Sequence, residues 1–542
     1  MQVHGASSFQ TEMVNAFFSR HHRHFNSFEV NLTVQRFDVM TRETFRLVAD
    51  RNGTQISATS YVTDSHSLRW ALNSLRKWVV SGASSPLDVT DKPDFRYRGT
   101  IEGFYGTPWS PAQRLKGVET FGDYGMNMFL VAPKDAHWQR FQWREPLNGE
   151  FIAELSELIS RGALHGVDVS ACVSPGLSVV YSDDADVAAV VAKFMQLAAL
   201  GAKHFGLLLD DIPDTLKDPQ DIERYPNIAA AHADFANRVR QVLVDEMPSA
   251  HLILCPMNYA GRGTEPYLHV LGDQLHPQID VMWTGREICS GYLDISDAVI
   301  FDRSTRRPPF YWDNYPVNDG SMSNRLHIGP VDGREAGLHR YSAGLLANPM
   351  ELFEASLIPL GTIGDYLWST TSYDPWASWE AVLVDAIPDV EDRAATRELF
   401  RNTLGLTGAW SPAFNAIIGE CSTAWRSGRP ADAAATAHQG ATTIATAHAR
   451  ITADSYCAPL LRDEISPWLE KYALGGQWLD RMGNVLDACS VNSSGQLTAT
   501  TRERDELMAL RAELGTNSRR LFGDGFDIML GELAAEILYT DA

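Results

Sequence analysis

The chain has 542 residues, of which 44% are hydrophobic and 21% are charged, a balance typical of a globular protein with a large buried core. It carries 46 Lys and Arg against 68 Asp and Glu, which gives a net charge of −22. Because so acidic a protein repels phosphate backbones and other polyanions, we expect no nucleic-acid partner and disfavour a polyanionic substrate.

The cysteines and the N-terminus indicate neither a metal site nor secretion. The six cysteines lie far apart and form no CxxC pair, so we expect no zinc site and no disulfide framework. Cys172 and Cys255 fall in apolar runs, where we expect small buried side chains. No apolar leader follows Met1, and no segment reaches the ~18–20 apolar residues of a membrane span. This predicts a cytoplasmic protein without membrane contact, or a secreted one if a leader precedes Met1.

Residues 1–95 indicate a small α+β domain. Residues 44–49 and 54–59 alternate in polarity on either side of Asn52-Gly53, a dipeptide typical of a type I′ hairpin. A helix is expected to begin at Asp64 or Ser65, with an apolar face formed by Leu68, Leu72, Leu75 and Val79.

Residues 96–372 alternate short apolar runs with helical stretches, and eight of the runs have strand character. These are Arg98–Phe104, Asn127–Pro133, Val167–Pro175, His204–Ile212, His251–Tyr259, Ile279–Gly285, Pro309–Pro316 and Ala343–Met350. Near-continuous apolar strands are typical of parallel sheets buried on both faces. Eight of them over this length predict a (β/α)8 TIM-type barrel, whose active site lies at the C-terminal ends of the strands.

Residues 373–542 lack strand patterns and indicate a helical bundle. Helical composition marks the stretches 393–405, 431–454, 464–489 and 498–522, and helical spacing is clearest in Leu507, Leu510, Leu514 and Leu521. We therefore expect three domains, with boundaries near residues 95 and 372. The pattern leaves open whether the helical domain forms a homodimer or binds a partner.

Asp210 and Asp211 end the apolar run of the fourth barrel strand. Asp is common in ordinary turns, but this pair lies where a barrel has its active site. Two close carboxylates in a site of low dielectric cannot both ionise readily, which raises one pKa. Such a pair provides one acid and one charged group near neutral pH.

Two neighbouring strand ends carry further candidates. Residues 102–109, Glu-Gly-Phe-Tyr-Gly-Thr-Pro-Trp, combine glycines that allow close backbone approach with aromatics that suit a sugar ring. Lys134 ends the second strand and can donate to sugar hydroxyls, although a lone Lys is usually a solvated surface charge. Nearby Arg140, Arg144 and Glu145 are interpreted as structural ion pairs.

The seventh strand ends in an aromatic and amide-rich segment, residues 311–319, Tyr-Trp-Asp-Asn-Tyr-Pro-Val-Asn-Asp. Sugars offer apolar C–H faces and many hydroxyls, so stacking surfaces with polar acceptors bind them well. An Asx-rich loop without ligand is the alternative. No P-loop, GxGxxG or histidine metal spacing occurs, so no cofactor and no metal are expected.

Together these motifs resemble glycoside hydrolase family 84, the β-N-acetylglucosaminidases that include O-GlcNAcases. The matching segments are residues 101–109, Ala132–Asp135, Trp143–Pro146, Ser174–Leu177, Leu209–Ile212, Trp283–Gly285, Trp312–Asn314, Asn318–Asp319 and Asn348–Met350. They follow the family order across about 250 residues, a length typical of one such barrel.

The resemblance implies a retaining, substrate-assisted mechanism, in which the 2-acetamido oxygen of the sugar attacks the anomeric carbon and forms an oxazoline. By this match Asp210 holds the acetamido N–H, and Asp211, kept protonated by its neighbour, is the general acid and then the base. The residues implied in substrate binding are Tyr259 at the acetamido oxygen, Trp312 lining the acetamido pocket, and Gly103, Lys134, Asn314, Asp319 and Asn348 at the sugar hydroxyls.

Three positions depart from the family pattern, and two other functions stay open. Ala136, Thr107 and Asn258 stand where many members have Asp, Arg and, in eukaryotes, Glu, which leaves the aglycone undefined. We expect removal of terminal GlcNAc from a glycan, glycoprotein or small glycoside. The alternatives are an endo-acting hyaluronidase, which the net charge disfavours, and a glycan-binding protein without catalysis.

Overall fold

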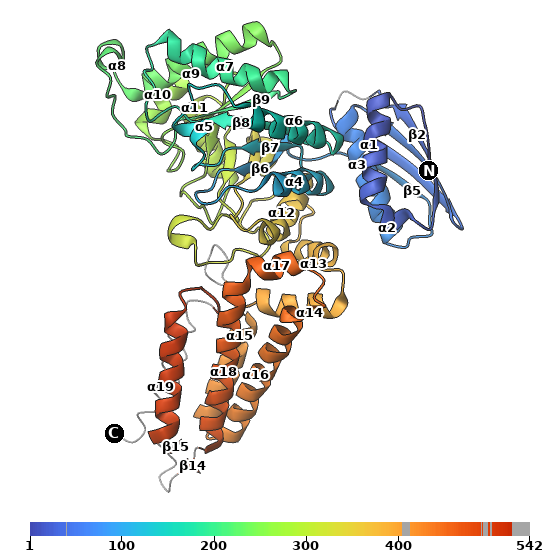
Figure 1. The fold of residues 1–542 in the computed structure, drawn as a ribbon, viewed down its shortest axis with the longest axis vertical. Helices are drawn as coiled ribbons and strands as arrows, with labels where there is room; N and C mark the ends of the chain where they lie inside the picture. The colour runs from blue at the N-terminus through green and yellow to red at the C-terminus, as the bar shows by residue number, and fades with distance from the viewer. Residues whose placement is uncertain (39–40, 404–411, 489, 492–496, 499–500, 523–542) are drawn as a thin grey trace. The chain divides into compact units, whose positions relative to one another are not determined.

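The computed structural model describes residues 1–38, 41–403, 412–488, 490–491, 497–498 and 501–522 (Figure 1). The chain forms two compact units. The first comprises residues 1–315, 331–351 and 360–374, and the second comprises residues 316–330, 352–359 and 375–542. No helix in the described ranges is long and apolar enough to cross a membrane. The boundaries of the three expected domains stay a prediction.

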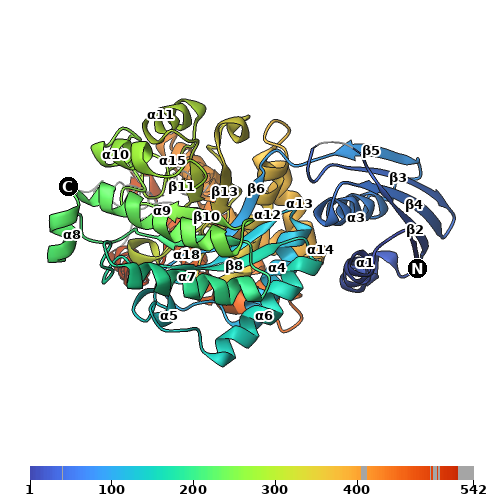
Figure 2. The same ribbon diagram turned by 90° about the horizontal axis from the view of Figure 1, so that it is seen from above.

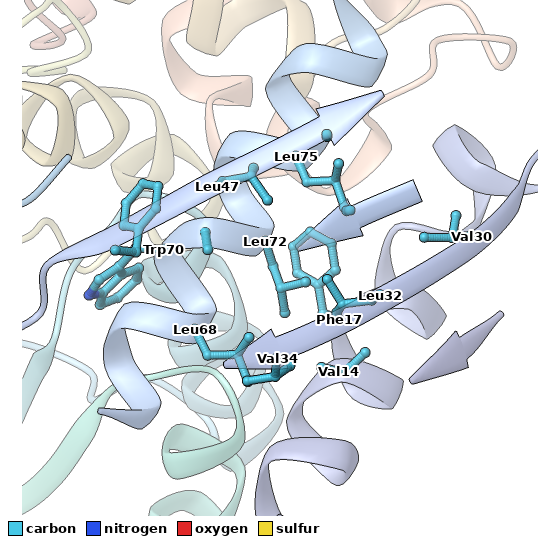
Figure 3. Close-up of a cluster of buried hydrophobic side chains, with 14 of the residues drawn as sticks. Val14, Phe17, Val30, Leu32, Val34, Leu47, Leu68, Trp70, Leu72 and Leu75 are labelled. Carbon is cyan, nitrogen blue, oxygen red and sulfur yellow. The ribbon is translucent and has the colours of Figure 1, made fainter. Parts of the chain in front are cut away.

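The first unit begins with a five-stranded sheet of order β1-β2-β4-β3-β5. Its strands are β1 (Gln2–His4), β2 (Glu29–Arg36), β3 (Phe45–Asn52), β4 (Gln55–Val62) and β5 (Leu87–Asp91), and its helices are α1 (Ser8–Arg20), α2 (His22–Phe25) and α3 (Ser65–Val80). Apolar residues of α1, α3 and the sheet form one core (Figure 3). Asp64 caps α3 by accepting from the Ser67 backbone N–H at 2.8 Å, so the expected helix is confirmed.

The β3–β4 hairpin is also confirmed, with its turn shifted by one residue. Asn52 pairs with Gln55, so the two-residue loop is Gly53-Thr54. Gly53 has a φ of 61°, a left-handed conformation that favours glycine.

Eight parallel strands then close into a barrel, in which β13 pairs with β6. They are β6 (Tyr97–Glu102), β7 (Met128–Val131), β8 (Asp168–Val173), β9 (His204–Leu208), β10 (His251–Cys255), β11 (Asp280–Trp283), β12 (Phe310–Asp313) and β13 (Gly344–Ala347). Each expected strand is present and the (β/α)8 fold is confirmed. The strands end earlier than the apolar runs, since the runs continue into the loops that carry the candidate site.

Helices surround the barrel between its strands (Figure 2). They are α4 (Pro111–Asp123), α5 (His137–Arg140), α6 (Gly149–Leu164), α7 (Asp184–Ala199), α8 (Pro219–Arg224), α9 (Ile228–Glu246), α10 (Pro266–Gln274), α11 (Ile295–Thr305), the 3-10 helix η2 (Leu338–Tyr341) and residues 360–368 of α12 (Phe353–Trp368). The 3-10 helix η1 (Gly320–Met322) and residues 353–359 of α12 belong to the second unit. The barrel interior is packed with apolar side chains, including the expected buried Cys172 and Cys255, and Trp312 belongs to this cluster.

A buried carboxylate connects the small sheet module to the barrel within the first unit. Asp123, the last residue of α4, accepts from Arg20 of α1 at 2.7 Å and from Arg69 of α3 at 2.5 Å. His21 approaches the same carboxylate at 2.8 Å. Burial alone would raise the pKa of Asp123, but these three groups hold it well below its usual range.

The second unit is mainly helical, as expected. It contains α13 (Pro375–Ala386), α14 (Val390–Phe400), α15 (Pro412–Arg426), α16 (Pro430–Thr452), α17 (Pro459–Glu464), α18 (Ser466–Ala488) and α19 (Thr501–Thr516), with the short strands β14 (Ser490–Val491) and β15 (Leu497–Thr498). Leu514 and Leu521 are buried. The side chains of Leu507 and Leu510, and Cys489, lie outside the described part.

Candidate active site

The two aspartates follow β9 at the C-terminal end of the barrel. Leu207, Leu208 and Leu209 are fully buried, and the Leu209 N–H donates to the Cys255 carbonyl at 2.8 Å, which extends the strand pairing to the edge of the site. Asp210 comes next and is buried. Asp211 has a φ of 52°, a left-handed conformation that costs about 1–2 kcal/mol for a residue with a side chain.

Lys134 lies against both carboxylates. It forms an ion pair with Asp210, and its Nζ is 4.0 Å from Asp211 Oδ2. The Nζ also lies 5.2 Å from the ring centroid of Trp312, within range of a cation–π contact. Burial alone would lower the pKa of Lys134, but Asp210 raises it above its usual value. Lys134 is therefore a buried cation of the site and not a surface charge.

Asp211 is held by two tyrosine hydroxyls. Tyr105 donates to Oδ2 at 2.8 Å and Tyr259 donates to Oδ1 at 2.9 Å. Partial burial raises the pKa of Asp211. Lys134, the two hydroxyls and Arg140 together lower it by more, so the net pKa lies below its usual value. The surroundings of Asp211 thus favour its charged form, because the Lys134 cation lies against both carboxylates, and the expected protonated acid stays a prediction.

Asp210 has one carboxylate oxygen without a donor. Lys134 contacts Oδ2, whereas Oδ1 is buried and no hydrogen-bond partner lies near it among the described residues. Leaving a buried acceptor unsatisfied costs about 1–3 kcal/mol, and such atoms are often functional. Oδ1 is therefore suited to accept an N–H from a ligand.

Carboxamides connect the ends of β6, β12 and β13. The Trp312 Nε1–H donates to Asn314 Oδ1 at 3.0 Å, and the Asn348 Nδ2–H donates to the same oxygen at 2.9 Å. The Gly103 N–H in turn donates to Asn348 Oδ1 at 3.1 Å. Asn314 Nδ2 donates to the Ile288 carbonyl at 2.7 Å, so both ends of its amide are fixed. This network orients polar groups that suit sugar hydroxyls.

Gly103 is required by the packing of Trp312. A Cβ at position 103 would lie 2.2 Å from Cζ2 of the Trp312 ring, well inside van der Waals contact. The absence of a side chain therefore lets the indole lie directly against the end of β6. Trp312 is 5% exposed as a residue, and its ring is suited to form a wall of the site.

The structure thus brings together eight of the nine residues expected in the site. These are Gly103, Lys134, Asp210, Asp211, Tyr259, Trp312, Asn314 and Asn348. The ninth, Asp319, belongs to the second unit, where it precedes η1. The catalytic and binding roles of all nine stay predictions.

The site contains one residue that was not expected there, Arg140, and one whose polar contacts were not predicted, Tyr105. Arg140 donates from Nη2 to the Asp211 carbonyl at 2.9 Å and from Nη1 to the Tyr105 hydroxyl at 3.0 Å, so its interpretation as a structural ion pair was wrong. Tyr105 was expected only as an apolar wall. By contrast, Arg144 forms the expected ion pair, with Asp186 at 2.6 Å. Trp283 is a core residue, stacked on Phe301 at 4.9 Å between ring centroids.

Comparison with known proteins gives consistent matches. A family model described as beta-N-acetylglucosaminidase (NAGidase) matches residues 98–401. Protein O-GlcNAcase of Rattus norvegicus and that of Mus musculus are each 32% identical over 274 residues, which cover 49% of this chain. The match spans only 29% of the length of those relatives.

Solved structures match over more of the chain. An Asp-to-Asn mutant of the Thermobaculum terrenum O-GlcNAc hydrolase is 31% identical, has a TM-score of 0.75, and is aligned over 83% of this chain and 96% of its own. CpGH84B aligns over 98% of this chain and 96% of its own with a TM-score of 0.81. At 21% identity, that second likeness concerns the fold alone.

Proposed function

The chain belongs to the β-N-acetylglucosaminidases of glycoside hydrolase family 84, and we propose that it is an exo-acting, retaining enzyme that removes terminal β-linked GlcNAc by substrate-assisted catalysis. The observation that carries this proposal is the buried, partnerless Oδ1 of Asp210, one residue from a second carboxylate. An acetamido N–H is a neutral donor of the kind that this oxygen lacks. The proposal extends to O-GlcNAc on proteins, which the names of the relatives support.

In the first step, Asp210 Oδ1 accepts the N–H of the 2-acetamido group and orients its carbonyl oxygen toward the anomeric carbon. That oxygen forms the new C–O bond as the glycosidic bond breaks, and Asp211 gives its proton to the leaving oxygen. The amide nitrogen gains positive charge in the oxazoline, which the Asp210 carboxylate stabilises. In the second step Asp211 takes a proton from water, the water oxygen bonds to the anomeric carbon, and the acetamido group is restored.

Substrate binding can favour the protonated form of Asp211, which takes its proton from the solvent. In the structure its pKa is held low partly by the hydroxyl of Tyr259. If the acetamido oxygen of a bound sugar accepts the hydrogen bond of the Tyr259 hydroxyl, Asp211 loses one donor. The bound sugar also shields the Asp211 carboxylate from water. Both changes raise the pKa of Asp211, so binding prepares the acid that the leaving group needs.

The first test is release of 4-nitrophenol from its β-GlcNAc glycoside, beside the β-GalNAc and β-Glc analogues. We expect turnover of the GlcNAc compound and none of the β-Glc compound, which lacks the internal nucleophile. Failure to turn over any of them, with a folded protein, would refute the proposal. A fall in the viscosity of hyaluronan would instead favour the endo-acting alternative.

The two aspartates should respond differently to substitution. Asp211→Asn should abolish turnover of alkyl β-GlcNAc glycosides, yet cost far less with a dinitrophenyl leaving group, which needs no acid. Asp210→Asn should slow both substrates alike, since both need the oriented acetamide. Asp214→Asn, an exposed aspartate of the same loop, is the matched control. Equal losses in the Asp211 variant on both substrates would contradict its role as the acid.

A further inference from the structure

The short helix α5 carries an arginine to the back of Asp211. Arg140 is buried and ends α5, which follows β7 in the chain. Its two terminal nitrogens have separate acceptors, the Asp211 carbonyl at 2.9 Å and the Tyr105 hydroxyl at 3.0 Å. A single guanidinium thus contacts both the backbone of Asp211 and one of its side-chain donors.

These two contacts restrict Asp211 in different ways. The hydrogen bond to the carbonyl fixes the peptide group at a residue whose φ of 52° lies in the left-handed region. The hydrogen bond to Tyr105 occupies a lone pair of the phenol oxygen, and the phenol proton is then directed at Asp211 Oδ2, 2.8 Å away. Loss of the guanidinium would free both the peptide group and the phenol.

The helix that presents Arg140 is itself held in place. Lys193 of α7 is buried, and its Nζ donates to the carbonyls of Trp138 at 2.7 Å and Gln142 at 3.1 Å. The Ser174 N–H donates to the Gln139 carbonyl at 3.0 Å. Contacts on both sides of α5 therefore fix the position from which Arg140 reaches Asp211.

We propose that Arg140 is a positioning residue, which holds Asp211 in its reactive orientation through the backbone carbonyl and through Tyr105. This rests on the proposed function of Asp211 as acid and base. Arg144, four residues along the chain, offers a contrast, because it binds Asp186 and Ser178 and makes no contact with the aspartate pair. Comparing variants of the two arginines therefore distinguishes an effect on the position of Asp211 from a general effect on stability.

The test compares Arg140→Met with Arg144→Met in the full chain, by kcat/KM against pH on an alkyl and a dinitrophenyl β-GlcNAc glycoside. In Arg140→Met we expect a loss of about 100-fold on the alkyl glycoside, the scale of a misplaced catalytic group, and a much smaller loss on the dinitrophenyl one. The charged and polar groups that face Asp211 are Lys134, Tyr105, Tyr259, Asp210 and Arg140. Because Arg140→Met removes one cation and releases Tyr105, the pKa of Asp211 should rise. The alkaline limb of the pH profile for the alkyl glycoside should therefore move to higher pH.

Arg140→Lys and crystal structures complete the test. Lysine restores the positive charge but cannot donate to the Asp211 carbonyl and the Tyr105 hydroxyl at once. The alkaline limb of the pH profile should therefore return toward its wild-type position, while turnover stays reduced. In crystals of Arg140→Met, Asp211 should leave its left-handed conformation or lose Tyr105, whereas Arg144→Met should keep both. An unchanged Asp211 in Arg140→Met, or the same limb shift in Arg144→Met, would overturn the proposal. The crystallographic result holds even if the wild-type protein hydrolyses no glycoside, which would refute the proposed function alone.

Discussion

Asp210 and Asp211 are adjacent in sequence but differ in their surroundings. Asp210 is buried against Lys134 and keeps one oxygen without a donor. The Asp211 side chain is 29% exposed and accepts from two phenols. A carboxylate fixed by a cation suits a constant charge, and one held by exchangeable hydroxyls suits proton transfer. These different surroundings support the proposed division of roles between the two aspartates.

Gly103→Ala tests how closely the indole must approach the strand end. A methyl group would lie 2.2 Å from the Trp312 ring, so the ring or the backbone must shift. We expect a rise in KM for a β-GlcNAc glycoside, because Trp312 also donates to Asn314. Steady-state kinetics and the melting temperature measure this. Gly149→Ala is the matched control, since its Cβ would meet no atom within 4 Å. Unchanged kinetics in Gly103→Ala would contradict the role of Trp312 as a fixed wall.

The aspartates and Lys134 could be predicted from the sequence because barrel topology brings the ends of neighbouring strands together. The place of Arg140 and the hydrogen bonds of Tyr105 could not. Their contacts join residues 35 and 71 positions apart and depend on how each side chain leaves its loop. The lowered pKa of Asp211 could not be predicted either. It depends on the position of Lys134 relative to both carboxylates, whereas the sequence shows only that the two aspartates are neighbours.

At the scale of elements, the barrel strands were predicted well and the N-terminal module less so. Most barrel strands are buried apolar runs, a signal that survives without tertiary context, whereas β6 also buries Arg98, Thr100 and Glu102. By contrast α1 and β2 were not predicted. Only Met13, Val14 and Phe17 of α1 are buried, so its apolar face is too narrow to be distinctive. Both elements gain their stability from the shared core of the module, which no local window contains.

The junction between α4 and the module predicts a pH-dependent stability. Asp123→Asn should lower the free energy of unfolding by about 3–5 kcal/mol near neutral pH, because Arg69 would be left buried without its charge partner. Since the folded pKa of Asp123 lies below its unfolded value, the ion pairs contribute fully above pH about 4 and are lost as the pH falls toward the folded pKa. Urea unfolding at several pH values measures this.

Asp88→Asn is the control for that experiment. Asp88 pairs with Arg46 at 2.8 Å on the surface, where ion pairs contribute little. We expect its unfolding curve to follow the wild type. If Asp123→Asn and Asp88→Asn were equally mild, or if the difference between Asp123→Asn and wild type grew on acidification, the buried junction would not stabilise the unit.

At the scale of the whole molecule, we expect the net charge to influence which substrates the enzyme accepts. The net charge of −22 creates a negative potential that raises the energy of an approaching anion. It has little effect on a neutral GlcNAc glycoside. The composition therefore predicts that neutral aglycones are preferred over anionic ones, a distinction that the site residues alone do not make.

Salt should reveal this selection. For an aryl β-GlcNAc glycoside with a carboxylate on the aryl ring, kcat/KM should rise as salt is added, because screening weakens the repulsion. For the uncharged aryl glycoside of similar leaving-group pKa, kcat/KM should stay nearly constant. A parallel response of the two substrates, or a fall for the anionic one, would show that a local field overrides the net charge.

The hydrogen bond from Gly103 to Asn348 joins the first barrel strand to the last, across 245 residues of chain. During synthesis from the N-terminus, most of the helices and strands precede Asn348 in the chain and can form before this contact does. Because loop closure over such a separation is slow, secondary structure should return well before the sugar site does. Recovery of glycosidase activity during refolding would then report the closure of the barrel, the last event, and not the collapse that precedes it.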